Sequence, residues 1–280
     1  MKSNQKGVAI VLAMGVVALA ALAATAMLVP QSTWSRQAEL AAGHVQARLI
    51  LQAGLDWSRA VLSDDRRASN VDHLGEPWAL RLPPIPVDNG IVAGHIEDQQ
   101  GKFNLNNVLT NGKVNQAQLA HFRGLLSVLD LPPALAGALA GWIEAGGGPL
   151  VDTGELAQVP GFDDRVRARL GPHVTALPRF TAVNVTTASP EVHAAIVEGL
   201  DLDSTWALVA QRKRVYFREP GEFFSQLPKG FIVPTADISV GSDYFIATMR
   251  VGIGESQARG SALLWRADAG WPAIVWRKTP

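Results

Sequence analysis

The chain has 280 residues and no cysteine, and its 25 basic residues balance 25 acidic residues at a formal net charge of zero. The lack of cysteine excludes disulfide bonds, thiolate nucleophiles and cysteine-ligated metals. The balanced charge argues against nucleic acid or an anionic membrane surface as the main partner. The length allows one large or two modest domains beside an apolar N-terminal segment.

This uncharged apolar segment runs from Val8 to Val29, behind a short stretch in which Lys2 and Lys6 are the basic residues. A helix of roughly 22 residues spans about 33 Å, which is enough to cross the hydrocarbon core of a bilayer. A short basic head before a long apolar helix orients the head to the cytoplasm and the remaining chain to the other side. The sequence therefore predicts a single membrane span at residues 8–29.

Two interpretations of this segment differ in where the chain is processed. In the first, it is a secretory signal peptide that is cut after the Ala-Thr-Ala pattern at residues 24–26. In the second, a membrane protease cuts between Gly7 and Val8, and the apolar helix stays on the mature protein as its anchor. Gly7 has no side chain, so a protease can approach this peptide bond closely. The second interpretation is favoured because the apolar run exceeds the ~7–15 residues of a signal-peptide core.

The helix is expected to continue beyond the membrane. Pro30 should kink it near the outer interface, and residues 31–62 are proline-free and rich in good helix formers. An apolar stripe recurs at spacings of three and four residues, at Ala42, Val45, Leu49, Ala53, Trp57 and Val61. We predict one stem helix of about 50 residues whose outer half packs this stripe on a soluble domain. A membrane anchor followed by a separate amphipathic helix is the alternative.

Strands are predicted on both sides of a long helical block. Residues 78–82 alternate as a strand that the prolines at 83–86 end, and a tight turn at 88–90 leads to a second strand at 91–98. Three more strands are predicted at residues 244–252, 262–266 and 272–277, with turns at 252–255 and 268–270. We expect one antiparallel sheet packed on the stripe of the stem. The predicted fold class is α+β, with a large all-α insertion between the strands.

The block between the strands has helical periodicity and clear cap residues. Helices are predicted at 115–129, 132–145, 164–170, 190–199, 204–214 and 219–228, with a further short helix after Asp152 or Thr153. The predicted division of the chain is a leader at 1–7, a membrane half of the stem at 8–29, a pilin-like α/β domain at 30–103 and 235–280, and an inserted helix-hairpin-helix-like or SAM-like domain at 104–234.

A polar motif joins the second strand to this block. Residues 98–107 read Asp-Gln-Gln-Gly-Lys-Phe-Asn-Leu-Asn-Asn. The strand should leave the sheet through a turn at Gly101, with Phe103 and Leu105 inserted into a core. Three side-chain amides, those of Asn104, Asn106 and Asn107, can bond nearby backbone and fix an irregular loop.

Five features together resemble the K-type minor pseudopilin of type II secretion systems, along nearly the whole chain. They are the Gly7 junction, the non-acidic Leu12, the D-x-x-G-[KR]-[FI]-N-[LI]-N pattern at 98–107, and the segments 155–161 and 183–188. The resemblance implies a subunit at the tip of the periplasmic pseudopilus, held in the bacterial inner membrane by one span with the bulk of the chain in the periplasm. It implies initiation and capping of the filament for export of folded proteins toward the outer-membrane secretin.

The same resemblance implies partners and processing. The partners are the I- and J-type minor pseudopilins, other pseudopilus subunits and the prepilin peptidase, which cleaves after Gly7; Val8 then becomes the N-methylated amine terminus. The family usually has a glutamate at the fifth mature position, where it pairs in the bilayer with the free amine of a neighbouring subunit. Here that position is Leu12. Leu12 suits the first subunit of a filament, which has no amine ahead of it to neutralise.

No cofactor, metal or catalytic site is expected. The family commonly has an acidic calcium loop after its Trp-rich helix, but here the loop is shortened to residues 144–149, with Glu144, Asp152 and Glu155 nearby. Calcium takes six to eight oxygen ligands, so we do not carry this site over. Known catalytic motifs such as G-x-S-x-G, H-E-x-x-H and a phosphate loop are absent, and the six histidines are scattered.

The alternative function is a membrane-anchored DNA-uptake or DNA-receptor protein. The apolar-x-Gly turn ending at Gly161 lies between two short helices, as in a helix-hairpin-helix unit that offers backbone amides to phosphate. Its support is a set of basic residues, Arg165, Arg167, Arg169 and the run Arg212-Lys213-Arg214. We nevertheless expect no nucleic acid partner.

Overall fold

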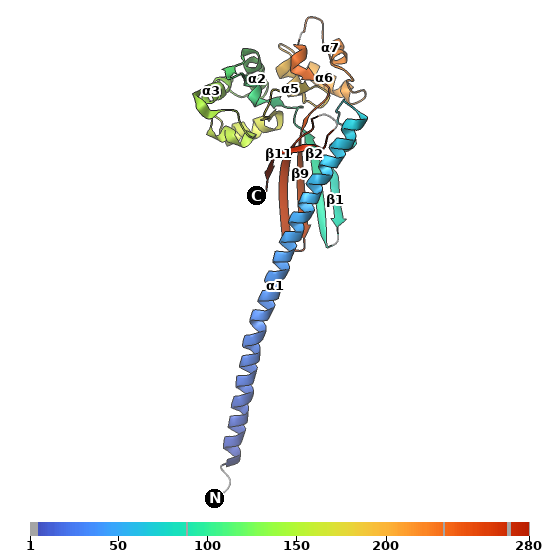
Figure 1. Ribbon diagram of the computed structural model, residues 1–280. Coiled ribbons are helices and arrows are strands. Elements are labelled where there is room, and N and C mark those ends of the chain that lie inside the picture. Colours follow the sequence, from blue (N-terminus) through green and yellow to red (C-terminus); the bar gives the residue numbers. More distant parts are fainter. Residues whose placement is uncertain (1–4, 88, 232, 268–269, 280) are drawn as a thin grey trace.

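The computed structural model of the protein describes residues 5–87, 89–231, 233–267 and 270–279, and for residues 5–6 and 26–33 it describes the backbone alone. A long helix rises from the N-terminus, lies across a sheet, and ends beneath a mainly helical head (Figure 1). Lys2 and the predicted turn positions 88 and 268–269 lie outside the described residues.

The long helix, α1, spans Gln5–Ala68 and has 64 residues, which is about 96 Å. It runs through position 30 without a break (Figure 1). The prediction of one continuous stem is therefore confirmed, whereas the expected kink at Pro30 does not interrupt the helix. Arg66 and Arg67 lie in the last turn, where positive charge is favoured by the helix dipole.

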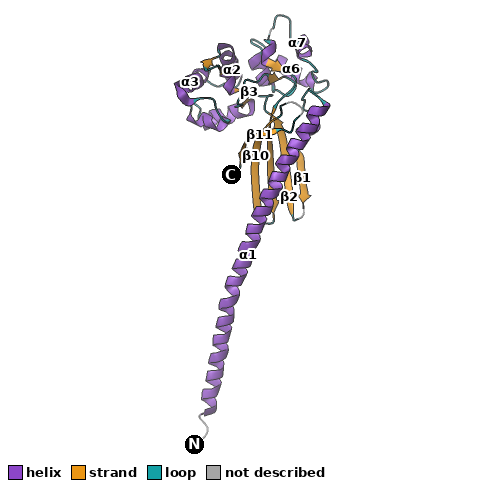
Figure 2. Ribbon diagram, viewed as in Figure 1, coloured by secondary structure: helices purple, strands orange, loops and turns teal. Residues whose placement is uncertain are grey.

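A five-stranded antiparallel sheet lies against the outer part of α1, as predicted (Figure 2). Its order is β1 (Leu82–Val87), β2 (Gly90–Asp98), β9 (Tyr244–Ile253), β10 (Ser256–Trp265) and β11 (Ala273–Lys278). The predicted strand at 78–82 is wrong, because residues 77–79 form a 3-10 helix and the proline-rich segment itself is β1. An edge strand tolerates prolines, since one side of its backbone needs no hydrogen bonds.

The face of α1 that meets the sheet differs from the predicted stripe. The buried positions are small or aliphatic, at Gly43, Ala47, Leu51, Leu55, Ser58 and Leu62. A Cβ added at Gly43 would lie 2.8 Å from the Ser256 hydroxyl, and one added at Gly54 would lie 3.3 Å from the Met249 side chain. The small residues thus let the sheet approach the helix closely. Of the predicted stripe, Val61 packs against this core, whereas Ala42, Val45, Leu49, Ala53 and Trp57 are exposed.

The chain between β2 and β9, residues 99–243, forms the head. Its helices are α2 (Gln116–Val128), α3 (Ala134–Trp142), α4 (Asp164–Leu170), α5 (Pro190–Ile196), α6 (Leu202–Arg212) and α7 (Pro220–Gln226). Short ladders also occur, β3 (Phe103–Asn104) with β6 (Val174–Thr175), β4 (Leu109–Thr110) with β5 (Lys113–Val114), and β7 (Val183–Asn184) with β8 (Ile238–Ser239). The side chains of Asn115, Asp152 and Asp163 cap their helices and accept hydrogen bonds from the first turns, and Asp152 is one of the two caps that the sequence predicts.

Two separate hydrophobic clusters account for this division. One fills the head and draws on residues from Phe103 to Ile238, whereas the other lies between α1 and the sheet and draws on residues from Ala47 to Leu264. The α+β fold class, with a long N-terminal helix, an antiparallel sheet and a helical insertion between its strands, is confirmed. The numerical domain boundaries stay a prediction.

Candidate functional site

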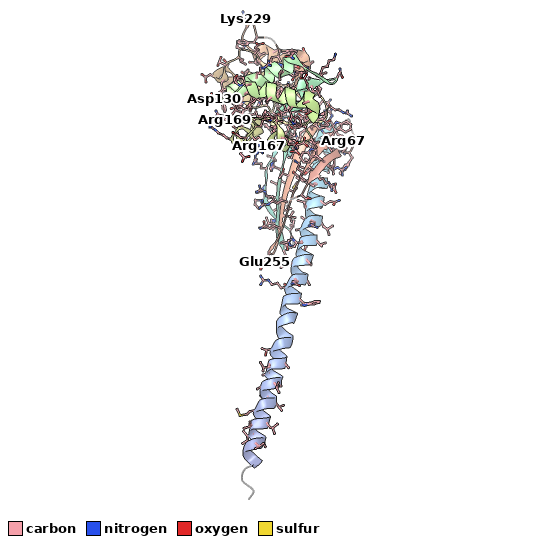
Figure 3. All side chains as sticks on the ribbon, turned by 90° about the vertical axis from the view of Figure 1, so that its left-hand side faces the viewer. Arg67, Asp130, Arg167, Arg169, Lys229 and Glu255 are labelled. Carbon is pink, nitrogen blue, oxygen red and sulfur yellow. The ribbon has the colours of Figure 1, made fainter. Side chains whose placement is uncertain are left out.

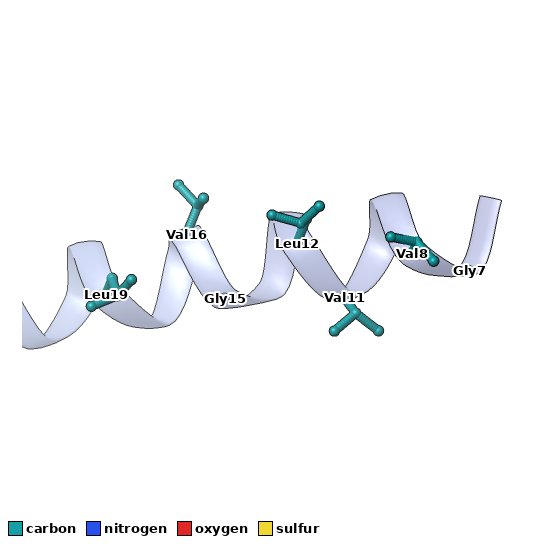
Figure 4. Close-up of a pocket in the computed structure, with 7 residues that line it drawn as sticks. All are labelled: Gly7, Val8, Val11, Leu12, Gly15, Val16 and Leu19. Atoms are coloured by element: carbon teal, nitrogen blue, oxygen red, sulfur yellow. The ribbon is translucent and has the colours of Figure 1, made fainter. Parts of the chain in front are cut away.

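The N-terminal end of α1 carries the predicted processing site. Gly7 and Val8 both lie within the helix, and Val8 and Leu12 are 62% and 64% exposed. Figure 4 shows these residues on an apolar helix surface, with open space beside Gly7 and Gly15 where side chains are missing. The helix between Gly7 and Thr25 is long and apolar enough to cross a membrane, with a mean hydropathy of 2.6 and no buried residue. An exposed apolar surface of this kind is typical of a membrane span, and a signal sequence has the same length and composition.

The predicted stripe forms a second exposed apolar surface on the stem, which we call the outer stripe (Val45, Leu49, Ala53 and Trp57). Val45, Leu49 and Trp57 are 59%, 65% and 48% exposed, although all three lie beyond the apolar N-terminal segment. The prediction that the sheet packs on the predicted stripe holds for Val61 alone and is wrong for the other positions, because the sheet packs on the neighbouring face that contains Gly43, Ala47 and Gly54. The outer stripe is consequently available to another molecule.

The asparagine motif fixes the base of the head, as the sequence predicts. Asn106 donates to the carbonyls of Leu150 and Leu177 at 2.8 and 2.9 Å, and its own Oδ1 accepts from the Leu150 amide at 2.8 Å. Asn107 exchanges two hydrogen bonds with the Thr181 backbone, at 2.8 and 3.1 Å. The side-chain amides therefore satisfy backbone groups that no strand pairs, and they link this segment to the loops at Leu150, Leu177 and Thr181.

A buried arginine joins the end of the stem to the head and the sheet. Arg266 donates through Nη1 to Asp65 at 2.6 Å and through Nη2 to both carboxylate oxygens of Asp72, at 2.5 and 2.7 Å. Its guanidinium lies 4.7 Å from the centre of the Phe245 ring. Burial and the nearby Glu76 carboxylate raise the pKa of Asp65 to about 6, despite the hydrogen bond from Arg266. The sequence does not predict this junction, because it shows only that Arg266 follows an apolar strand.

A second polar group extends this junction into the head. Asn184 donates from Nδ2 to the carbonyl of Asp72, to Asp98 and to the Ser242 hydroxyl, at 3.0, 3.1 and 2.9 Å. Asp98 also accepts from Thr187 at 2.5 Å. Complete burial raises the pKa of Asp98 to about 6, and these hydrogen bonds only partly oppose the effect. These hydrogen bonds hold Asp72, Asn184 and Ser242, which are far apart in the sequence, in fixed positions relative to one another.

The acidic groups at this junction are already satisfied without a metal. Ligand oxygens of Asp65, Asp72 and Glu76 lie within 4.8 Å of one another. However, Arg266 binds the first two, and Glu76 accepts from the His73 amide and the Trp78 indole at 2.9 and 2.7 Å. An arginine thus supplies the positive charge that a cation would otherwise bring.

The carboxylates near the shortened loop have structural partners as well. Asp152 caps the 3-10 helix Thr153–Gln158 and pairs with Lys278 at 2.6 Å. Glu155 accepts from the Val151 amide at 2.7 Å. These roles match helix caps and a link from the head to β11 rather than a calcium cage.

Three of the six basic residues that favoured DNA binding have partners within the head, whereas Arg165, Lys213 and Arg214 are exposed. Arg212 is 7% exposed and donates to the carbonyls of Val185 and Ala188 at 2.8 and 2.7 Å. Arg169 pairs with Asp130 at 2.7 Å, and Figure 3 labels these two residues side by side on the head. Arg167 pairs with Asp164. A phosphate would have to break these contacts to reach the guanidinium groups of Arg167, Arg169 and Arg212.

Comparisons with known proteins show to which family this chain is similar. Two family models described as "Type II secretion system (T2SS), protein K" match residues 101–179 and 183–239. The Type II secretion system protein K of Pseudomonas aeruginosa is 29% identical over 290 residues, covering 91% of this chain and 87% of that protein. The chain is similar to the type II secretion system protein K family along most of its length. That family is a structural pseudopilin component of the secretion system.

Other relatives agree with this assignment. The protein K of Aeromonas hydrophila is 27% identical, over 80% of this chain and 81% of that protein. The fold also matches a chain in the crystal structure of the GspK-GspI-GspJ complex from enterotoxigenic Escherichia coli, with a TM-score of 0.64 and 20% identity. That match covers 89% of this chain and 99% of the other. The resemblance to the K-type minor pseudopilin family is therefore confirmed.

Proposed function

We propose that this protein is the minor pseudopilin at the tip of the type II secretion pseudopilus, where it initiates and caps the filament for export of folded proteins. The outer stripe carries this proposal. It is a row of exposed apolar side chains, at Val45, Leu49 and Trp57, on a helix whose opposite side already packs on its own sheet. A neighbouring stem helix would bury this row and gain roughly 25 cal/mol for each Å² of apolar surface removed from water.

The partners that we propose are the I- and J-type minor pseudopilins. The fold neighbour of this chain was solved in a complex with GspI and GspJ, which supports the same assembly here. The head widens the molecule beyond the end of the stem (Figure 1). A head of this width would hinder a further subunit from stacking above it, as a terminal position requires.

We further propose that the prepilin peptidase cleaves between Gly7 and Val8 and that the new amine of Val8 is N-methylated. The apolar helix would then remain as a single inner-membrane span, with the rest of the chain in the periplasm. Mass analysis of the N-terminus of membrane-extracted protein tests this proposal. A chain that begins at methylated Val8 supports it, whereas a chain that begins at Met27 indicates a cleaved signal peptide and contradicts it.

Co-purification of the full-length protein with the I and J subunits tests the assembly. We expect a stable complex that Leu49→Glu weakens, because a charge would be buried against a neighbouring helix. The matched control is Ala41→Glu, which introduces the same charge at an exposed position of α1 off the stripe. The absence of a complex at micromolar concentration, or equal effects of both variants, would contradict the assignment of the outer stripe.

A further inference from the structure

A groove of about 820 Å³ lies between α1 and the last two strands of the sheet. The stem crosses the sheet mainly over β9 and β10, and leaves the edge strand β11 uncovered beside it (Figure 1). Arginines from three elements line the groove, namely Arg48 of α1, Arg259 of β10 and Arg277 of β11. The fold therefore gathers positive charges that are far apart in the sequence.

These arginines have no counter-charge within the described part of the chain. All three are exposed, and none takes part in an ion pair with Asp or Glu, a side-chain hydrogen bond or a cation–π contact there. The described groove lining contains no carboxylate, although the whole chain has as many acidic as basic residues. The sequence neighbours Asp56 and Glu255 are engaged elsewhere, with Arg59 at 2.9 Å and Arg36 at 3.1 Å.

The position of the groove on the stem restricts the anion that it can bind. From Val29, the predicted end of the membrane segment, to His44 at the groove, α1 rises by about 22 Å. The polar headgroup layer extends only about 5–8 Å beyond the hydrocarbon core. Lipid headgroups therefore do not reach the groove.

The remaining wall of the groove favours a polypeptide over other polyanions. Half-buried Ala258 lines it together with the arginines, whereas Leu51 and Leu55 beneath them are buried in the core between α1 and the sheet. An occupant can therefore place an apolar side chain on Ala258 beside its negative charges. The edge strand β11 adds unpaired backbone groups on one side. Guanidinium groups bind carboxylates through paired hydrogen bonds, which provide both charge and geometry.

We propose that this groove binds an acidic polypeptide segment of another protein, with its carboxylates on Arg48, Arg259 and Arg277 and an apolar side chain on Ala258. This binding site is separate from the outer stripe, which lies on the opposite side of α1 from the sheet. It does not depend on the proposed position at the pseudopilus tip.

Fluorescence anisotropy on the full-length chain in a neutral detergent tests the proposal. The probe is a labelled peptide rich in glutamate and leucine, and its control has glutamine in place of glutamate. We expect the acidic peptide alone to bind, and the double variant R48Q/R277Q to weaken its binding by about tenfold or more, which corresponds to about 1.4 kcal/mol. The double variant R48K/R277K should keep most of the affinity, because it retains the charges.

The matched control is Arg165→Gln, which removes the same charge from an exposed position on α4. It should leave the affinity unchanged, and equal melting temperatures of all variants establish that each one is folded. The proposal is overturned if R48Q/R277Q binds as tightly as the wild type, or if the glutamine peptide binds equally well. Tighter binding of a sulfated polysaccharide or an oligonucleotide of the same charge would overturn the assignment of a polypeptide.

Discussion

Arg266 holds both carboxylate oxygens of Asp72 with a single nitrogen, at 2.5 and 2.7 Å, where the stem, the sheet and the head meet. Both side chains are essentially inaccessible to solvent, at 0% and 1% exposure. Asp72 follows the end of α1, whereas Arg266 follows the end of β10. The pair therefore ties the segment that follows the stem to the end of β10, and Arg266 also donates to the Ser242 carbonyl at the end of the head.

We predict that Arg266→Met destabilises the protein strongly. The methionine replaces much of the volume but leaves the carboxylates of Asp65 and Asp72 buried without a cation. Removal of one partner from a buried pair typically costs about 3–5 kcal/mol. Thermal and urea unfolding of the purified full-length protein measure this loss.

The control for this prediction is Arg67→Met, since Arg67 forms a pair of similar type with Asp64 at 3.2 Å. Both side chains of that pair are exposed, at 61% and 74%. An exposed pair of this kind contributes less than about 1 kcal/mol. Equal stability of Arg266→Met and the wild type would show that the junction does not depend on the arginine.

Replacement of Asn106 by alanine should loosen the base of the head. The change removes three hydrogen bonds to the backbone of Leu150 and Leu177, and leaves these buried groups without a side-chain partner. Unsatisfied buried polar groups cost about 1–3 kcal/mol each, so we expect a loss of several kcal/mol. Hydrogen exchange should show faster exchange at Leu150 and its neighbours, whereas the exposed control Asn70→Ala should change neither stability nor exchange.

Much of this fold could be predicted from periodicity and caps, but the packing face of the stem could not. Val45, Leu49 and Trp57 form the more hydrophobic stripe, so a rule based on apolar spacing selects them as the core side. The sheet instead packs on Gly43, Ala47 and Gly54. These small residues let the two backbones come close, and the resulting dense packing stabilises the interface more than contacts with larger side chains would. In a subunit with two packing faces, periodicity shows that a stripe exists without showing which partner covers it.

The asparagine motif could be predicted from the sequence, whereas the arginine junction could not. Asn104, Asn106 and Asn107 act within one short segment, so their capping role was predictable from local chemistry. Arg266 meets Asp65 and Asp72 across about 200 residues of chain. No local pattern encodes a contact of that separation, and the same holds for the arginines of the groove.

Substitution at Gly54 tests the close approach of stem and sheet. A Cβ at this position already lies 3.3 Å from the Met249 side chain, so the larger Gly54→Leu should force the helix and β9 apart. We expect destabilisation by about 1–3 kcal/mol from overpacking, despite the better helix propensity of leucine. Ala53→Leu is the control, because its neighbouring position on the outer stripe is exposed. Equal melting temperatures of the two variants would contradict this packing.

The buried Asp98 carboxyl should make stability depend on pH. Its pKa is raised to about 6 in the folded protein, from 3.8 in the unfolded chain. The neutral form is thus favoured by folding, so this contribution is fully present below pH 3.8 and is lost as the pH rises through about 6. A difference of about 2 pKa units corresponds to about 3 kcal/mol.

The variant Asp98→Asn isolates this effect, since it removes the titration and retains the shape. Asparagine cannot accept every hydrogen bond that Asp98 accepts. The free energy of unfolding of the variant should therefore also differ from that of the wild type by an amount that does not depend on pH. As the pH rises from about 4 to 7, we expect the free energy of unfolding of the variant to increase relative to that of the wild type. Urea unfolding at each pH measures it, and a difference that is independent of pH would contradict the raised pKa.

Introduction of a carboxylate at the fifth position after the proposed cleavage site tests the tip position directly. In a subunit with no neighbour ahead of it, Leu12→Glu would place an acid in the bilayer without an amine to pair with it. A charge there costs about 2.5–3.5 kcal/mol on insertion scales, which should lower the yield of assembled complex and the export of a reporter protein. Leu12→Gln is polar but uncharged and should reduce export much less. If Leu12→Glu supports normal export, an amine from another subunit must reach this position, and the chain then lies within the shaft of the filament rather than at its tip.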